Sequence, residues 1–139
     1  MAFNAYVFFS GGTCAEAFEH YRDVFGGELA VMRMSEVPQE ARMPGAEPDF
    51  VMHASLRVGD GLLMGSDDPT GDGGPKQGLS VSYSAPDADT ARRVFDALAQ
   101  GGEVTMALEP TFWSAAFGMC TDRFGVPWMV DVESSGASA

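Results

Sequence analysis

The sequence has few cysteines, few basic residues and no long hydrophobic run. Its 139 residues include 2 cysteines and only 8 lysines and arginines against 20 aspartates and glutamates, for a formal charge of -12. Such a charge would repel a phosphate backbone, so we expect no nucleic acid partner. No stretch approaches the roughly 18 apolar residues of a membrane span, which excludes a membrane protein.

The opening residues MAFNAYVFF lack the basic segment and the small-residue cleavage site of a secretory signal. We therefore expect a cytoplasmic protein. Cys14 and Cys120 lie far apart in a chain without such a signal, which favours reduced thiols over a disulfide. With 45% hydrophobic and 20% charged residues, the composition is typical of a globular domain.

Two segments space their apolar residues by three and four, as helices do. In CAEAFEHYRDVFGG the expected N-cap is Thr13 and the expected stop is Gly26-Gly27. In DADTARRVFDALAQGG the expected N-cap is Asp87 and the expected stop is Gly101-Gly102. Because both segments end in the same way, we looked for an internal repeat.

The second half of the sequence aligns with the first. At a shift of 74 residues, VFFS lies over VSYS, and the two helical segments coincide. At a shift of 66, VMHASLRVGDGLLMGSD lies over FGMCTDRFGVPWMVDVE, which matches Gly59 with Gly125 and Leu63 with Met129. Each half is therefore predicted to contain a strand, a helix, a strand and a hairpin.

The repeat predicts the domain organisation. We expect one domain over residues 1-133, made of two modules at about 4-67 and 78-133. The last residues, 134-139, are expected to form a disordered tail. Within the first module, residues 35-50 are rich in proline and lack periodicity, so they predict a long loop that could act as a lid.

A duplicated β-α-β-β-β unit resembles the vicinal oxygen chelate superfamily, which includes glyoxalase I, ring-cleaving dioxygenases and bleomycin-binding proteins. The segments YVFFSG, YRDVFGG, HASLRVGDGLLMGSD and TFWSAAFGMCTDRFGVPWMVDVE are similar to its PhnB-like branch. The resemblance implies an α+β fold in which two βαβββ modules form a cupped mixed β-sheet, with the helices outside and a ligand cavity inside. It also implies a homodimer, since relatives commonly pair and open sheet edges favour pairing.

Strand alternation assigns side chains to the two faces of such a sheet. Under the helices we expect Val7, Phe9, Val81 and Tyr83. Toward the cavity we expect Tyr6, Phe8, His53, Ser80 and Ser82.

The resemblance also implies where a metal would bind. Metal-using members take His, Glu or Gln ligands from the first and last strands of each module, which here fall on Tyr6, Ser80, Leu63 and Met129. Hydroxyl, alkyl and thioether groups are poor ligands for a divalent cation, so we expect no metal and no other cofactor. The alternative ligands are His53, Asp67, Cys120, Asp131 and Glu133.

Four residues have two interpretations each. His53 could act as a base, or be a structural histidine bonded to a neighbour. Asp131 shares a face with Met129 and could orient His53, or be a solvated carboxylate at the sheet edge. Phe112 and Trp113 would wall the cavity or pack at a subunit interface.

Three functions stay open. The first is binding of a small molecule in an intermodule cavity without a catalytic metal. The second is an enzyme of lyase, isomerase or dioxygenase type, using either a metal on displaced ligands or His53 as general base with Asp131 as its orienting group. The third is a dimeric scaffold whose cavity is filled by its own side chains. The predicted ligand-binding residues are Tyr6, Phe8, Ser80, Ser82, Trp113, Met119 and Met129.

Overall fold

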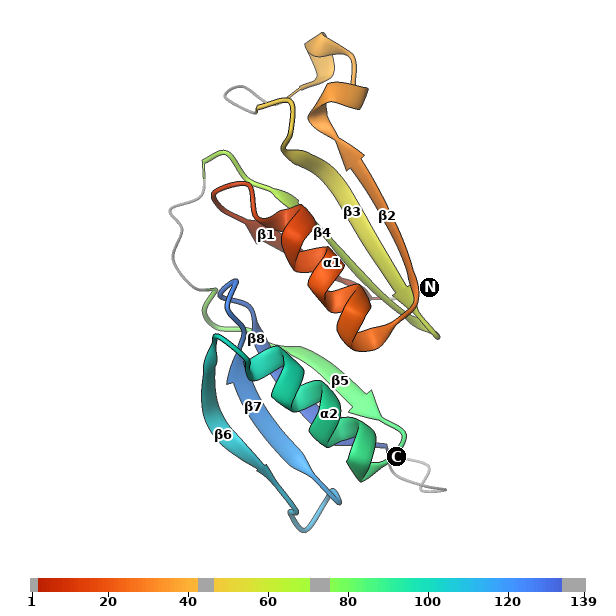
Figure 1. The fold of residues 1–139 in the computed structure, drawn as a ribbon, viewed down its shortest axis with the longest axis vertical. Coiled ribbons are helices and arrows are strands. Elements are labelled where there is room, and N and C mark those ends of the chain that lie inside the picture. Colours follow the sequence, from red (N-terminus) through yellow and green to blue (C-terminus); the bar gives the residue numbers. More distant parts are fainter. Residues whose placement is uncertain (1–2, 43–46, 71–75, 134–139) are drawn as a thin grey trace. The chain divides into compact units, whose positions relative to one another are not determined.

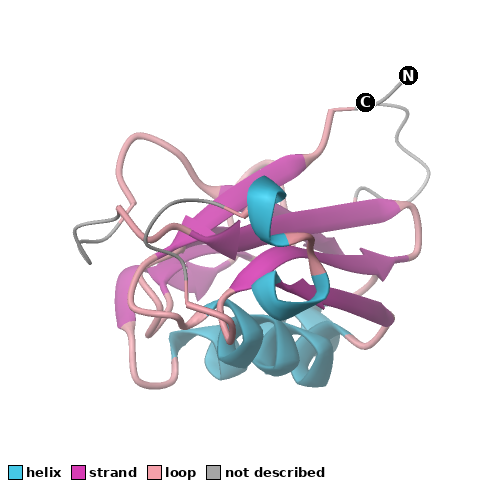
Figure 2. Ribbon diagram, turned by 90° about the horizontal axis from the view of Figure 1, so that it is seen from above, coloured by secondary structure: helices cyan, strands magenta, loops and turns pink. Residues whose placement is uncertain are grey.

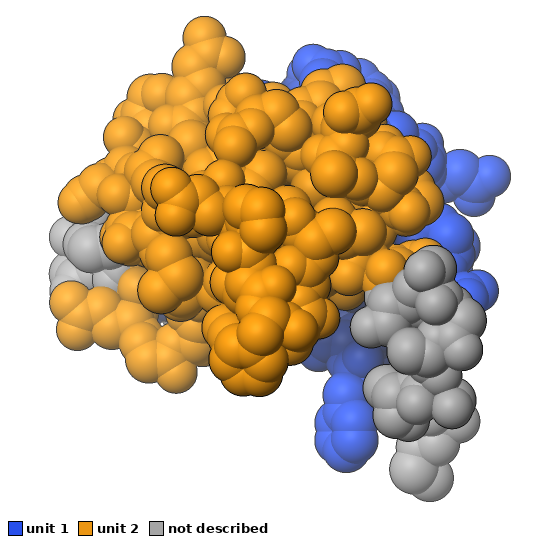
Figure 3. Space-filling model, turned by 90° about the horizontal axis from the view of Figure 1, so that it is seen from below, with its two compact units in different colours: residues 1–74 blue, residues 75–139 orange. Residues whose placement is uncertain are grey.

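The computed structural model describes residues 3-42, 47-70 and 76-133, and the predicted tail at 134-139 lies outside these ranges. The chain divides into two compact units, residues 1-74 and 75-139 (Figure 3). In each unit, one α-helix covers one face of a four-stranded mixed sheet (Figures 1 and 2). The predicted α+β class with two βαβββ modules is confirmed.

Unit 1 has the strand order β1-β4-β3-β2, in which β1 and β4 are parallel and the other pairs antiparallel. Two short 3-10 helices lie between β2 and β3. The elements are β1 (Ala5–Phe9), α1 (Cys14–Phe25), β2 (Glu28–Arg33), η1 (Met34–Glu36), η2 (Gln39–Ala41), β3 (Val51–Val58) and β4 (Gly61–Asp67).

Unit 2 repeats this topology with the strand order β5-β8-β7-β6 and a parallel pair of β5 and β8. Its elements are β5 (Val81–Ala85), α2 (Ala88–Ala99), β6 (Glu103–Glu109), β7 (Phe117–Thr121) and β8 (Pro127–Val132). Within the described ranges, neither unit contains a helix with the length and hydrophobicity needed to cross a membrane.

In each unit, an aromatic ring of the helix packs against a glycine of the sheet. A Cβ atom at Gly65 would lie 2.8 Å from the ring of Phe18 on α1, and one at Gly118 would lie 2.9 Å from the ring of Phe95 on α2. Both rings are buried, as are the other apolar residues that face the sheets from the two helices. The glycines therefore set how closely helix and sheet approach in each core.

The two helices begin in different ways. The α2 helix starts at the predicted N-cap, where the Asp87 carboxylate accepts a hydrogen bond from Thr90 N at 2.7 Å. Thr13 holds the N-cap position of α1, but its hydroxyl donates to Ser10 O and caps nothing. The predicted N-cap position of Thr13 is therefore confirmed, although its side chain makes no capping hydrogen bond.

A buried carboxylate from β4 takes over the role of the N-cap of α1. Asp67 accepts hydrogen bonds from Cys14 N at 2.9 Å and from Val51 N at 2.8 Å, and only 1% of its surface is exposed. One side chain thus joins the start of the helix, the end of β4 and the start of β3. The carboxylate also suits the positive end of the helix dipole.

The described ends of the predicted 35-50 loop are joined to each other. Met34 N donates to Phe50 O at 2.8 Å, and Ser35 N donates to Pro48 O at 3.1 Å. Met34 and Val37 are buried, so this part of the loop packs into unit 1. Residues 43-46 lie outside the described ranges, and the lid stays a prediction.

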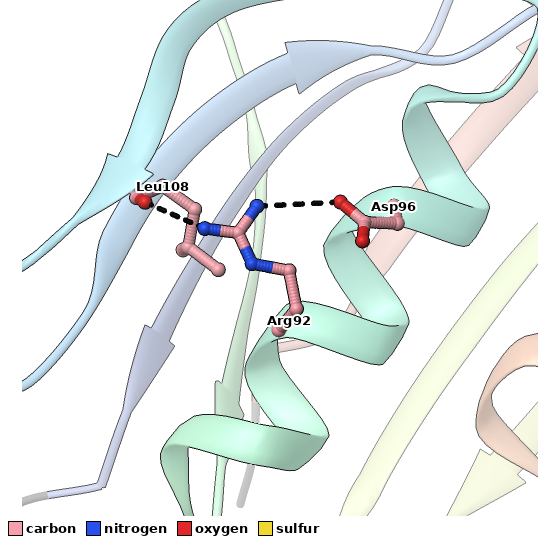
Figure 4. A network of polar contacts seen from close by, with 3 residues as sticks. All are labelled: Arg92, Asp96 and Leu108. Carbon is pink, nitrogen blue, oxygen red and sulfur yellow. Dashed lines mark hydrogen bonds and ion pairs between the residues drawn. The ribbon is translucent and has the colours of Figure 1, made fainter.

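An arginine on α2 links the helix to the edge strand of its sheet (Figure 4). Arg92 donates through Nη2 to Leu108 O on β6 at 2.9 Å, and its Nη1 lies 3.3 Å from Asp96 Oδ1, one helical turn further on. Because both charged side chains are more than half exposed, the ion pair itself adds little to stability. Its effect is to orient the guanidinium toward the Leu108 carbonyl.

We expect the Asp67→Ala substitution to lower the free energy of unfolding by about 2–4 kcal/mol, because two buried N–H groups would lose their acceptor. The matched control is Asp87→Ala, which removes a solvent-exposed cap and should cost about 1 kcal/mol. Urea denaturation followed by circular dichroism measures both. Equal losses for the two variants would show that Asp67 is only a local cap.

Candidate functional site

The face of the first sheet that α1 leaves uncovered carries a tyrosine and histidine pair. Tyr6 on β1 lies opposite Met64 on β4, which lies opposite Ser55 on β3. The Tyr6 hydroxyl is 3.2 Å from His53 Nδ1, and the two ring centroids are 5.6 Å apart. The ring of Phe8 follows at 5.2 Å from that of Tyr6. We call Tyr6, Phe8, His53, Ser55 and Met64 the unit 1 face.

The Tyr6 hydroxyl holds the imidazole of His53. A phenol can donate to Nδ1 or accept from it, and either arrangement sets the tautomer of the ring and leaves Nε2 for a ligand or a proton transfer. Within unit 1, the orienting partner of His53 is therefore Tyr6. Asp131 belongs to unit 2, and its role toward His53 stays a prediction.

The face of the second sheet that α2 leaves uncovered carries a row of thioethers. Met106 on β6 lies opposite Met119 on β7, which lies opposite Met129 on β8. Ser82 on β5 continues the row beside Met129. Methionine side chains adapt to the shape of an apolar ligand, so this row is a flexible binding surface.

A carboxylate lies next to the thioether row on β8, because Asp131 is the next residue after Met129 on the same face of the strand. Asp131 lies between Ser84 and Phe117 on the neighbouring strands, and the Ser84 hydroxyl donates to Asp131 Oδ1 at 2.7 Å. The Phe117 ring packs edge-on against Trp113 at 5.5 Å, so Trp113 borders this face from the loop between β6 and β7. We call Ser82, Ser84, Met119, Met129 and Asp131 the unit 2 face.

The structure divides the predicted site residues between the two units. Tyr6, Phe8 and His53 come together on the unit 1 face. Ser82, Met119, Met129 and Asp131 share the unit 2 face, with Trp113 at its border. Ser80 precedes β5 and is half-buried, so it lies outside the strand that carries Ser82. A single ligand that contacts both faces stays a prediction.

The predicted match of Leu63 with Met129 is wrong by one residue. Leu63 lies opposite Ala5 and Leu56, on the side of the sheet that α1 covers. In the register of β4 the counterpart of Met129 is Met64, because both lie on the uncovered face beside the parallel strand. A slip of one residue moves a side chain to the opposite face of a strand.

The slip arises because the two hairpins have loops of different length. Val58 pairs with Gly61 across a two-residue turn, whereas Thr121 pairs with Pro127 across a longer loop. The longer loop folds around Asp122, a buried carboxylate that accepts hydrogen bonds from Phe124 N, Val126 N and Trp128 Nε1. Matching the glycines in the sequence hid this difference, and only the acidic residue itself could have indicated it.

The first and last strands of each module along the sequence, β1 and β4 in unit 1 and β5 and β8 in unit 2, do not offer a good set of metal ligands. On the uncovered faces, these strands present Tyr6, Phe8, Met64 and Ser66 in unit 1, and Ser82, Ser84, Met129 and Asp131 in unit 2. One carboxylate among hydroxyls, thioethers and rings does not fit a divalent cation. Among the residues that the structure describes, no three His, Cys, Asp or Glu side chains form a group that could hold one.

Two of the alternative ligands have other roles in the structure. Asp67 is committed to two backbone N–H groups, and Cys120 lies on the side of β7 that α2 covers, with 1% of its surface exposed. Burial, with a smaller contribution from the Asp122 charge, raises the pKa of the Cys120 thiol to about 11. Glu133 follows β8 and is exposed.

Comparison with known proteins gives consistent matches along nearly the whole chain. A family model described as the Glyoxalase/Bleomycin resistance protein/Dioxygenase superfamily matches residues 5–130. The Escherichia coli protein YjdN is 31% identical over 141 residues, covering 95% of each chain. The crystal structure of PA1353 from Pseudomonas aeruginosa is 43% identical, with a TM-score of 0.85 over 96% of this chain and 98% of that one.

A Bacillus cereus PhnB protein, described as a putative 3-demethylubiquinone-9 3-methyltransferase, has a similar fold. It is 23% identical, with a TM-score of 0.74 over 96% of this chain and 100% of that chain. At this identity the likeness concerns the fold alone.

The buried thiol gives a test with a defined pH dependence. Cys120 should react with iodoacetamide at pH 8 at least about 100-fold more slowly in the native than in the urea-unfolded protein, because burial raises the thiol pKa from 9.0 to about 11 and leaves only 1% of the residue exposed to the reagent. The thiol's contribution to stability is complete below pH 9 and is lost as the pH rises toward 11. Mass spectrometry of the labelled peptide measures the rates, and Cys120→Ser should remove this part of the alkaline loss of stability.

Proposed function

Since this chain belongs to the Glyoxalase/Bleomycin resistance protein/Dioxygenase superfamily, we propose that it binds a small molecule on the unit 1 and unit 2 faces without a catalytic metal. Members of this family typically bind small molecules. The family hosts several activities on one scaffold, so the ligand must be argued from the side chains of the two faces.

The observation that carries the proposal is the exposed aromatic and polar cluster of the unit 1 face. Tyr6 and Phe8 are 40% and 57% exposed, although both belong to a strand whose alternate residues are buried. The Tyr6 contact to His53 orients an imidazole beside these rings. Aromatic walls with a few fixed polar groups are typical of ligand sites.

The unit 2 face supports the same function with different chemistry. Met119 and Met129 provide an adaptable apolar surface, and Ser82 adds a hydroxyl at its edge. The Ser84 and Asp131 pair provides a carboxylate whose first oxygen is already hydrogen bonded. This face can therefore accept hydrogen bonds from a ligand that also has an apolar part.

The second candidate function is an enzyme of lyase, isomerase or dioxygenase type from the same superfamily. The contact of Tyr6 with His53 supports His53 as a general base when Nδ1–H donates to the Tyr6 hydroxyl oxygen, because Nε2 then carries the free lone pair that accepts a proton. Asp131 as the orienting group of His53 stays a prediction. A metal-dependent version has less support, because the donor set is poor in carboxylate and imidazole groups.

We further propose a homodimer in the cytoplasm without a nucleic acid partner. The edge strands β2 and β6 offer backbone groups for pairing with a second copy. The formal charge of -12 opposes association with phosphate backbones.

The chain's two histidines allow a direct test by NMR of the imidazole ring signals. Against a library of small aromatic and aliphatic amines, amides and acids, a ligand should shift the His53 signals and leave those of His20 on α1 unchanged. His53→Ala and Tyr6→Phe should each weaken the affinity about 3- to 10-fold, the worth of one hydrogen bond. The control Glu16→Gln changes an exposed carboxylate on α1 and should have no effect.

Two results would decide between the proposals. Ligands that bind with equal affinity to wild type and His53→Ala would remove the unit 1 face from the site. Chemical conversion of a bound ligand by wild type, lost in His53→Ala at saturating ligand, would favour the enzyme over the binding protein.

A further inference from the structure

The loop between β6 and β7 holds two aromatic rings at an exposed tip. Thr111 N donates to Ser114 O at 2.9 Å, and Thr111 Oγ1 accepts from Ser114 N at 3.1 Å, which closes a tight turn around Phe112 and Trp113. Phe112 is 97% exposed and Trp113 54% exposed, and their rings meet edge to face at 4.7 Å. The turn therefore presents two rings that are already ordered by local hydrogen bonds.

The tip is also tied to the last strand of the sheet. The Ser114 hydroxyl donates to Ala116 O at 2.6 Å and accepts from Val132 N at 3.3 Å. The aromatic tip and the end of β8 thus border a shallow, open pocket of about 410 Å³. The pocket is lined by Pro110, Thr111, Phe112, Trp113, Ser114, Ala115, Val132 and Glu133.

Glu133 is the charged residue of this pocket. Its backbone is fixed, since Glu133 N donates to Ala85 O at 2.7 Å, while among the described residues no basic side chain forms an ion pair with its carboxylate. Glu109 and Asp131 are the partners of Phe117 on the neighbouring strands, and the Phe117 ring packs against that of Trp113. Among the residues that line the pocket, the one charge is therefore negative.

This combination selects one class of ligand. The face of an indole or phenyl ring attracts a cation, and a carboxylate adds a longer-range attraction of the same sign. An anion would be repelled by Glu133, and a neutral apolar molecule would gain nothing from it. A metal ion would find only one carboxylate among rings and hydroxyls, which is a poor ligand set.

We propose that the pocket formed by the 110-115 loop and Glu133 binds an organic cation, a substituted ammonium group on a small apolar body. The proposal rests on the proposed function, because Trp113 borders the unit 2 face, and it adds the charge class of the ligand. The ammonium group lies against Trp113 and Phe112 and within reach of the Glu133 carboxylate. The apolar body extends along Phe117 toward the thioether row.

Choline and its neutral isostere 3,3-dimethyl-1-butanol test the charge directly. The chain has two tryptophans, so its NMR spectrum contains two indole N–H signals, and that of buried Trp128 is an internal control. Choline should shift the Trp113 signal and leave the Trp128 signal in place. The alcohol should bind at least about fivefold more weakly, the ratio expected for one exposed cation–π contact.

Two matched variants separate charge from shape. Glu133→Gln should weaken choline binding about three- to tenfold and leave binding of the alcohol unchanged, whereas Glu103→Gln, an exposed carboxylate on β6, should change neither. Phe112→Ala removes a ring that is almost fully exposed, so the variant should keep its fold. Its affinity for choline should nevertheless be lower than that of the wild type.

The outcomes distinguish this proposal from the proposed function. Equal affinity for choline and the alcohol would contradict the proposed positive charge of the ligand, while Trp113 would still belong to a ligand site. Absence of any Trp113 shift, with both probes at the highest concentration the protein tolerates, would overturn the pocket itself. In either case, ligand binding on the unit 1 face is measured independently by the shift of the His53 ring signals.

Discussion

Each four-stranded sheet has one helix, and one helix covers one face. Because side chains alternate along a strand, this constraint divides every strand into residues that build the core and residues that remain available for function. In β1, Val7 and Phe9 are buried under α1 while Tyr6 and Phe8 remain exposed. The location of His53 beside Tyr6 follows from the same division. The strands β1 and β3 lie on either side of β4, and both Tyr6 and His53 point to the face that α1 leaves uncovered.

Much of this division could be predicted from the sequence, because it depends on local periodicity. The helical spacing located both helices, and Asp87 caps α2 as predicted by accepting a hydrogen bond from Thr90 N. The alignment at a shift of 74 pairs Tyr6 with Ser80, whereas the strand registers make Ser82 the counterpart of Tyr6, since Tyr6 lies opposite Met64 and Ser82 opposite Met129. Alternation along VFF and VSYS still gave the correct faces for Tyr6 and Ser82. A slip of two residues along a strand returns a side chain to the same face, so that error had no consequence.

The errors arose where long-range contacts decide. The cap of α1 comes from Asp67, 53 residues away from Cys14 in the sequence, and no local pattern announces it. Leu63 was assigned to the wrong face because Gly59 and Gly125 look equivalent, although the second hairpin loop is longer and folds around Asp122. Here an error of one residue inverts the face, so a small misalignment changes a proposed site completely.

The two modules resemble each other where they are buried and differ where they are not. On the helix side both keep apolar residues and a glycine beneath an aromatic ring, because the packing of helix on sheet demands it. On the uncovered side of unit 1, the Tyr6 phenol and the Phe8 ring of β1 lie beside the His53 imidazole. On the uncovered side of unit 2, Ser82 and Ser84 of β5 lie beside a thioether and a carboxylate. The repeat is therefore a property of the two cores, and the chemistry of each uncovered face must be argued from its own side chains.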